Sequence, residues 1–270
     1  MAVDLARGSH SYDVQDLSMK QIATAKYYTD KLVAFTRENG FRSSAALLGK
    51  NIIWPFCEWL IRRRIRAHER FDLKYGVDTQ TPILIRHLET SAPGAEYANP
   101  YEGAAIPLVR RILHQLKIDL RRFTFVDLGS GKGRVLLIAA QYPFKSVIGV
   151  EFSETLHRIA LSNIARFCSC GVTRTRPTSV NMDAAAFDFS QLRNKIVFCN
   201  NPFKADLMID VLERLRRSLA ETSDEGILIY LTPIPPQIKK RLDIYEIVGQ
   251  GRYLSHFGGF QSYYIYRIGN

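Results

Sequence analysis

From about residue 123 to the end of the chain, the hydrophobic pattern alternates between two periods. Short apolar runs of strand length, such as Ser146–Val150 and Lys195–Cys199, precede stretches in which apolar residues recur every three or four positions, such as Thr155–Phe167 and Ala205–Leu219. Strands that alternate with amphipathic helices are typical of a mostly parallel sheet with helices on both faces. The pattern therefore predicts an α/β fold of three layers.

Element boundaries follow from the same pattern. It predicts a helix over Ala104–Leu116, loops over Phe71–Thr79 and Ser91–Ala95, and a turn over Gln237–Leu242. Seven strands are expected, at Phe123–Val126, Ser146–Val150, Thr178–Met182, Lys195–Cys199, Gly226–Thr232, Ile244–Leu254 and Phe260–Ile268.

A glycine-rich turn follows the first predicted strand. It reads Asp-Leu-Gly-Ser-Gly-Lys-Gly over residues 127–133, and the apolar run Val135–Ala140 continues as a helix. Glycines at these positions remove side chains where a ligand must lie against the backbone. The first turn of the helix presents N–H groups and the positive end of its dipole to that ligand. We therefore expect a ligand-binding loop here.

The positions of two acids narrow the choice of ligand. A dinucleotide site uses G-x-G-x-x-G around a pyrophosphate, whereas this turn places Asp127 where it would repel a phosphate. That acid suits a ligand with positive charge, such as the ammonium and sulfonium of S-adenosylmethionine. Glu151, which closes the second predicted strand, can accept hydrogen bonds from both hydroxyls of an adenosine ribose. A nicotinamide site and a structural turn without ligand are the alternatives.

The chain from about residue 75 to its end resembles the class I S-adenosylmethionine-dependent methyltransferases. Within that superfamily, residues 127–131 and the segment Phe-Cys-Asn-Asn at 198–201 resemble the lysine methyltransferases of the telomeric-silencing-disruptor type. The resemblance implies a Rossmann-like, mostly parallel sheet of seven strands in the order 3-2-1-4-5-7-6. It also implies S-adenosylmethionine as the cofactor.

The resemblance assigns further residues to the cofactor. Asp183, directly after the third predicted strand, would hold the adenine amino group with Met182 near the ring, and Asp188 competes for that role. Glu102 matches an acid that contacts the cofactor from the loop before the first helix of the domain, or it is an acid that complements the helix dipole. The loop residues predicted to line the cofactor are Leu128, Gly129, Ser130, Gly131 and Gly133.

The fourth predicted strand delivers Asn-Asn-Pro-Phe to the carboxyl edge of the sheet, where open α/β sheets bind ligands. A nitrogen nucleophile must aim its lone pair along the sulfonium–methyl bond while its N–H groups are held elsewhere. Asparagine oxygens can accept those N–H groups, and a phenylalanine can flank the amine. The residues predicted to position the acceptor are Asn200, Asn201 and Phe203.

This segment also resembles the N-P-P-F of methyltransferases that act on amino groups of adenine, cytosine or glutamine, with Asn201 in place of the first proline. We predict direct in-line methyl transfer to a nitrogen acceptor, such as a protein lysine. A nucleic-acid acceptor, a small-molecule acceptor and a non-catalytic cofactor-binding module are the alternatives.

The formal net charge of +11 favours polyanions or anionic surfaces as neighbours, or serves solubility alone. The four cysteines, Cys57, Cys168, Cys170 and Cys199, lack the spacing of a metal site. We therefore expect no metal, reduced thiols and a cytoplasmic protein.

Residues 1–74 lack the alternation of strands and helices that marks the methyltransferase domain predicted over 75–270. We expect residues 1–74 to form an N-terminal arm and a helical extension. Residues Trp54 to Arg66 combine an apolar, aromatic segment with an arginine cluster, which would suit weak contact with a membrane surface or a polyanion. The alternative is a helix that packs on the catalytic domain as a lid or substrate wall.

Overall fold

The computed structural model describes residues 70–81, 103–201, 204–222, 224–254 and 260–268. The chain divides into two compact units, Met1–Trp54 and Pro55–Asn270, and every described residue belongs to the second. The predicted domain boundary near residue 74 stays a prediction. Other predictions fall outside the described residues: those for Cys57, Glu102, Phe203, Ser91–Ala95 and Trp54 to Arg66.

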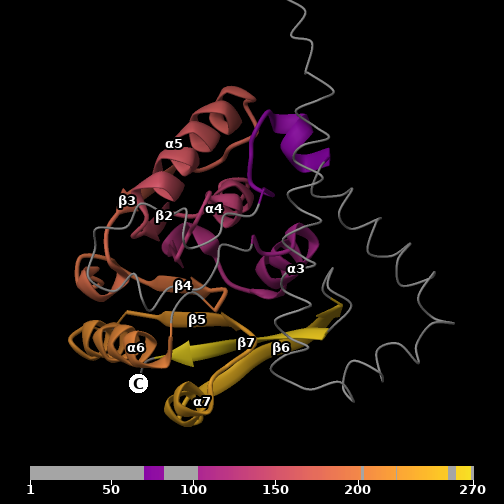
Figure 1. The fold of residues 1–270 in the computed structure, drawn as a ribbon. Helices are drawn as coiled ribbons and strands as arrows, with labels where there is room; N and C mark the ends of the chain where they lie inside the picture. The colour runs from indigo at the N-terminus through magenta and orange to yellow at the C-terminus, as the bar shows by residue number, and fades with distance from the viewer. Residues whose placement is uncertain (1–69, 82–102, 202–203, 223, 255–259, 269–270) are drawn as a thin grey trace, which may run out of the picture. The chain divides into compact units, whose positions relative to one another are not determined.

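Short helices and strands alternate along the second unit, and Figure 1 carries their labels. The helices are α3 (Ile106–Gln115), η3 (Leu120–Arg122), α4 (Arg134–Ala139), α5 (Glu154–Ser169), η4 (Ala184–Ala186), α6 (Ala205–Ala220) and α7 (Pro236–Leu242). The strands are β1 (Thr124–Leu128), β2 (Ser146–Glu151), β3 (Pro177–Asn181), β4 (Lys195–Cys199), β5 (Gly226–Leu231), β6 (Glu246–Leu254) and β7 (Phe260–Ile268).

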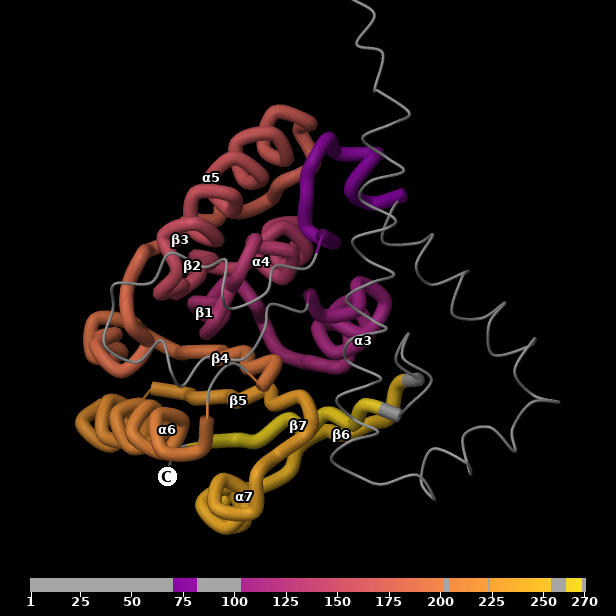
Figure 2. The backbone as a smooth tube through the Cα atoms, viewed as in Figure 1, coloured from indigo at the N-terminus to yellow at the C-terminus, as the bar shows by residue number. Residues whose placement is uncertain are grey.

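The strands form one seven-stranded sheet in the order β3-β2-β1-β4-β5-β7-β6, which confirms the predicted order. Strands β1 to β5 run parallel to one another, and β7 lies between β5 and β6 and is antiparallel to both. Figure 2 traces β1 between β2 and β4. The carboxyl ends of β1, β2 and β4 therefore meet at one edge, where a ligand can reach all three.

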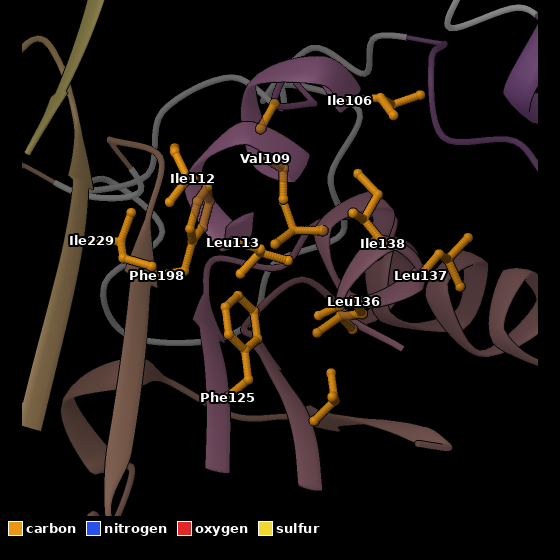
Figure 3. Packing of buried hydrophobic residues seen from close by; sticks show 14 of the residues in the cluster. Ile106, Val109, Ile112, Leu113, Phe125, Leu136, Leu137, Ile138, Phe198 and Ile229 are labelled. Atoms are coloured by element: carbon orange, nitrogen blue, oxygen red, sulfur yellow. The ribbon is translucent and has the colours of Figure 1, made fainter. Parts of the chain in front are cut away.

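Helices cover both faces of the sheet, as Figure 1 shows, and each face has its own apolar cluster. Phe125 and Phe198 point from the sheet toward Leu113 of α3 (Figure 3), in a cluster that also includes α4 and α5. On the other face, Val126 and Val197 pack with α6 and α7. Because successive strand residues point to opposite faces, the continuous apolar strands of the sequence fill both clusters.

Two segments predicted to lack helical structure are helical. Residues 70–75 form a helix, whose Phe71 and Tyr75 lie four positions apart and are both buried. Residues Pro236–Leu242 form α7, whose Ile238 and Leu242 repeat that spacing. The prediction of a turn here is wrong because it treats Pro236 as a helix breaker, whereas a proline at the first helical position is compatible with the start of a helix.

Within the part of the chain that the structure describes, no helix is both long enough and apolar enough to cross a membrane.

Candidate cofactor and acceptor site

The glycine loop, residues 129–133, has a backbone that only glycine adopts without strain at three positions. The φ angles of Gly129, Gly131 and Gly133 are +71°, +54° and +84°, all in the left-handed region. The N–H groups of Gly129 and Ser130 donate to the carbonyl of Val150 at 2.9 and 3.1 Å. The loop is thereby tied to the end of β2, next to Glu151.

Glu151 faces the glycine loop. Its Oε2 accepts a hydrogen bond from the N–H of Gly131 at 2.7 Å, and its Oε1 accepts one from Ser153 at 2.9 Å. A carboxylate has about four lone-pair positions, so each oxygen can still accept another donor. The predicted role of Glu151, to accept hydrogen bonds from ribose hydroxyls, is therefore compatible with the contacts it already makes.

Asp127 is a buried carboxylate that accepts no hydrogen bond from any described residue. Burial raises its pKa well above the usual value, and the charge of Glu151 raises it further. Burial also raises the pKa of Glu151, to about 7, against three backbone N–H groups that lower it. Two neighbouring buried acids without a cation are unfavourable when both are ionised. The pair therefore fits a positively charged ligand such as S-adenosylmethionine.

Lys132, in the middle of the loop, does not reach into this site as a phosphate ligand would. Its Nζ donates to Asp78 at 2.9 Å, and the side chain is 1% exposed. With its one lysine paired elsewhere and an acid at its start, the loop is poorly suited to a pyrophosphate. This geometry favours a sulfonium nucleoside over the nicotinamide alternative.

The end of β3 lies against the end of β2. The amide of Asn181 donates to the carbonyls of Glu151 and Phe152, both at 2.9 Å, which fixes the backbone that directly follows the Glu151 side chain. Asp183 follows directly, and its Oδ1 caps η4 by accepting from Ala185 at 2.9 Å, which leaves Oδ2 for a ligand. Met182 is 41% exposed between them.

Asp188 lies farther along, is exposed, and caps its own turn by accepting from the N–H of Ser190. Asp183 stays the predicted adenine ligand. Sequence reasoning missed Asn181 because its side-chain contacts depend on the pairing of β2 with β3.

The predicted acceptor residues follow β4. Asn200 Oδ1 accepts a hydrogen bond from Nε2 of Gln261 at 3.3 Å, and the same nitrogen donates to the carbonyl of Thr232 at 3.2 Å. Asn201 turns the chain sharply out of the strand with a φ of +48°. Gln261 thus holds the Asn200 amide at the junction of β4, β5 and β7. No sequence pattern pointed to Gln261, because its position depends on the antiparallel insertion of β7.

We expect a Gln261→Leu variant to bind S-adenosylmethionine as the wild type does but to turn over about tenfold more slowly, since one hydrogen bond that orients Asn200 is lost. Calorimetry and steady-state kinetics measure the two effects separately. Gln250→Leu is the matched control, because Gln250 is an exposed glutamine on the neighbouring strand β6. Normal turnover in the Gln261 variant would contradict a positioning role.

The described residues contain no evident set of ligands for a metal ion. They contain no group of three or more His, Cys, Asp or Glu side chains that could hold an ion. Cys168, Cys170 and Cys199 have free thiols, and Cys199 is buried in β4.

Sequence comparison finds related proteins. Residues 95–223 match the family described as "Histone methylation protein DOT1". A curated relative in Drosophila melanogaster, "Histone-lysine N-methyltransferase, H3 lysine-79 specific", is 29% identical over 165 residues. That alignment covers 56% of this chain but 8% of the relative, so the chain corresponds to a small part of it.

Solved structures with a similar backbone include a ribosomal protein L11 methylase from Lactobacillus delbrueckii subsp. bulgaricus (TM-score 0.46, 16% identity, 63% of this chain and 81% of the other). Another is an RNA methyltransferase from Salinibacter ruber (TM-score 0.45, 16% identity, 63% of this chain and 95% of the other). The chain is thus similar to a histone methylation family over residues 95–223, and its strand order is the one that the resemblance to class I S-adenosylmethionine-dependent methyltransferases implied.

Proposed function

We propose that this domain transfers a methyl group from S-adenosylmethionine to the side-chain nitrogen of a protein lysine. The observation that carries the cofactor assignment is the buried carboxylate of Asp127 beside Glu151, for which no described residue supplies a hydrogen bond or a cation. The lysine assignment is supported by the match to the DOT1 family and by the named specificity of the Drosophila relative.

The proposed roles follow from the chemistry of each group. S-adenosylmethionine, when bound, supplies an electrophilic methyl group on a positively charged sulfur. Asp127 would offset the positive charge of the cofactor, Glu151 would accept from the ribose hydroxyls, and Asp183 would accept from the adenine amino group. These contacts orient the cofactor at the carboxyl edge of the sheet without any covalent step by the protein.

The acceptor must present a neutral amine. A lysine ammonium has a reference pKa of about 10.4, and an apolar environment lowers it by disfavouring the charged form. The amide oxygen of Asn200, oriented by Gln261, can then accept one N–H of the amine while the lone pair faces the methyl group. The domain thus needs to desolvate and orient the amine rather than provide a strong base.

Radiolabelled S-adenosylmethionine tests the acceptor class directly. The protein is incubated with separated histone, nucleic-acid and small-metabolite fractions, and the labelled product is digested and identified by mass spectrometry. We expect label on lysine side chains, and at least a tenfold loss with Asn200→Ala. Asn194→Gly is the control, because Asn194 lies at the opposite end of β4 and already has a positive φ of 37°.

A nucleic-acid acceptor is the second candidate. The Asn-Asn-Pro-Phe segment at 200–203 and the net charge of +11 both suit a base with an exocyclic amino group and a phosphate backbone. Label confined to the nucleic-acid fraction would replace the lysine proposal with this one. Label confined to metabolites would exclude both.

A further inference from the structure

The segment 70–81, which we call the brace, packs against α5 and contacts the glycine loop. Figure 1 shows it beside α5, and the rings of Phe71 and Tyr75 lie 5.8 and 4.6 Å from that of Phe167. The helix of the brace ends at Gly76, whose φ is +63°, and the N–H of Val77 donates back to the carbonyl of Asp72. The brace is therefore an ordered element with its own cap.

One buried amide joins the brace to the glycine loop. Asn163 of α5 accepts from the N–H of Asp78 at 2.9 Å and donates to the carbonyl of Asp78 at 2.8 Å. Its Nδ2 also donates to the carbonyl of Lys132 at 2.9 Å. Asn163 is 2% exposed, so losing either partner would leave buried polar groups without hydrogen bonds.

An ion pair between a buried lysine and a partly exposed aspartate adds a second link. Lys132 lies between Gly131 and Gly133, and its Nζ donates to Asp78 at 2.9 Å. Gly131 in turn donates its N–H to Glu151. A continuous series of contacts thus runs from the brace through the glycine loop to a carboxylate of the predicted cofactor site.

Arg134, the first residue of α4, forms the third link. The buried guanidinium donates to Oγ1 of Thr79 at 2.9 Å and to its carbonyl at 2.6 Å. It also donates to the carbonyls of Gly103 and Ala104 at 3.1 and 3.3 Å. A Cβ on Gly103 would lie 2.6 Å from Nη1, so a larger residue at that position would have to displace the Arg134 guanidinium.

Burying two cations beside a loop is unfavourable unless their partners are held in place. Apolar side chains at positions 132 and 134 could be buried with a smaller desolvation penalty. We therefore infer that Lys132 and Arg134 do more than fill space. The partners described above belong to the brace or to residues 103–104, and none of them is a described residue of the predicted cofactor site.

We propose that the brace is a positioning element for cofactor binding. Through Asn163 and the Lys132–Asp78 pair it holds the glycine loop in the conformation that binds the cofactor. Docking of the brace and binding of the cofactor therefore stabilise each other, since coupling between two sites is reciprocal. The inference rests on the proposed function in one respect, which is that the cofactor is S-adenosylmethionine.

Hydrogen exchange measures the coupling in the wild-type protein. S-adenosylhomocysteine, the demethylated cofactor, serves as the probe because it does not react. We expect it to slow amide exchange in the peptide 70–81, at Val77, Asp78 and Thr79 above all, although these residues lie outside the predicted cofactor site.

Two variants break the links separately. Lys132→Met removes the ion pair and leaves Asp78 partly solvated, and Asn163→Leu removes the amide. We expect each to bind S-adenosylhomocysteine about tenfold more weakly, because the loss of a buried hydrogen bond destabilises the binding conformation of the loop. The KM for S-adenosylmethionine should rise with kcat at saturation unchanged.

Arg166→Met is the matched control. Arg166 donates to the carbonyl of Gly76 at 2.9 Å, so it contacts the brace but not the glycine loop. Its affinity for S-adenosylhomocysteine should stay within about twofold of the wild type, because an exposed hydrogen bond contributes little.

The outcomes separate the two proposals. If the wild type binds S-adenosylhomocysteine but exchange in 70–81 does not change, or if both folded variants bind it normally, the brace proposal is wrong and the proposed function stands. If the wild type does not bind it, the cofactor assignment itself is wrong, and the brace proposal falls with it.

Discussion

An Asp127→Asn variant should lose most of its affinity for S-adenosylmethionine and yet unfold at a higher temperature than the wild type. In the free protein the carboxylate is buried, accepts no hydrogen bond from a described residue and is repelled by Glu151, so a neutral amide of the same shape removes an unfavourable charge. In the complex the same change leaves the positive charge of the cofactor without its partner. Breaking a buried charge pair costs about 3 kcal/mol, on the order of 100-fold in affinity.

Calorimetry and thermal unfolding of the free protein measure the two effects. Asp188→Asn is the control, because Asp188 is an exposed acid of the same domain that caps its own turn. That variant should change neither quantity by much. An Asp127→Asn protein with lower stability and normal affinity would show that the carboxylate is structural.

The positions of the strands were predictable from the hydrophobic pattern, whereas their order was implied by the resemblance to class I methyltransferases. The central strands β1, β4 and β5 are buried along their whole length and appear in the sequence as nearly continuous apolar runs, and the glycine loop follows the first of them. Lys195–Cys199 and Phe260–Ile268 were predicted with the boundaries that the structure has. The loop was recognisable because its three left-handed φ angles favour glycine over every other residue.

The side chains that support the site were not predictable, because they act across the fold. Gln261 reaches Asn200 over 61 positions, and Asn163 reaches Asp78 over 85. Nothing in the sequence indicated that Lys132 and Arg134 are buried, because lysine and arginine side chains are mostly exposed in folded proteins. Their partners lie in the brace, part of which had been predicted as a loop, since only its packing on Phe167 makes the apolar spacing of Phe71 and Tyr75 meaningful.

The second large effect that we expect is a strong dependence of cofactor affinity on pH. Burial raises the pKa of Glu151 from 4.5 to about 7 in the free protein, and the pKa of Asp127 is raised as well. A ligand with positive charge binds the ionised pair, so binding near and below pH 7 must release protons. For each proton released, affinity falls by up to tenfold per pH unit. We expect at least a tenfold weaker complex at pH 5.5 than at pH 7.5.

The stability of the free protein should change in the opposite sense over the same range. Because the folded pKa of Glu151 lies above the unfolded value, the folded state holds more protons between about pH 4.5 and 7, and stability is lost as the pH rises through that window. Cofactor at saturation should reverse the trend, since the ionised pair then has a cation beside it. Calorimetry in two buffers of different ionisation heat counts the protons released when the cofactor binds. A Glu151→Gln variant should show a weaker dependence of cofactor affinity on pH. An affinity that does not change from pH 5.5 to 7.5 would mean that the cofactor's charge does not face this pair of acids.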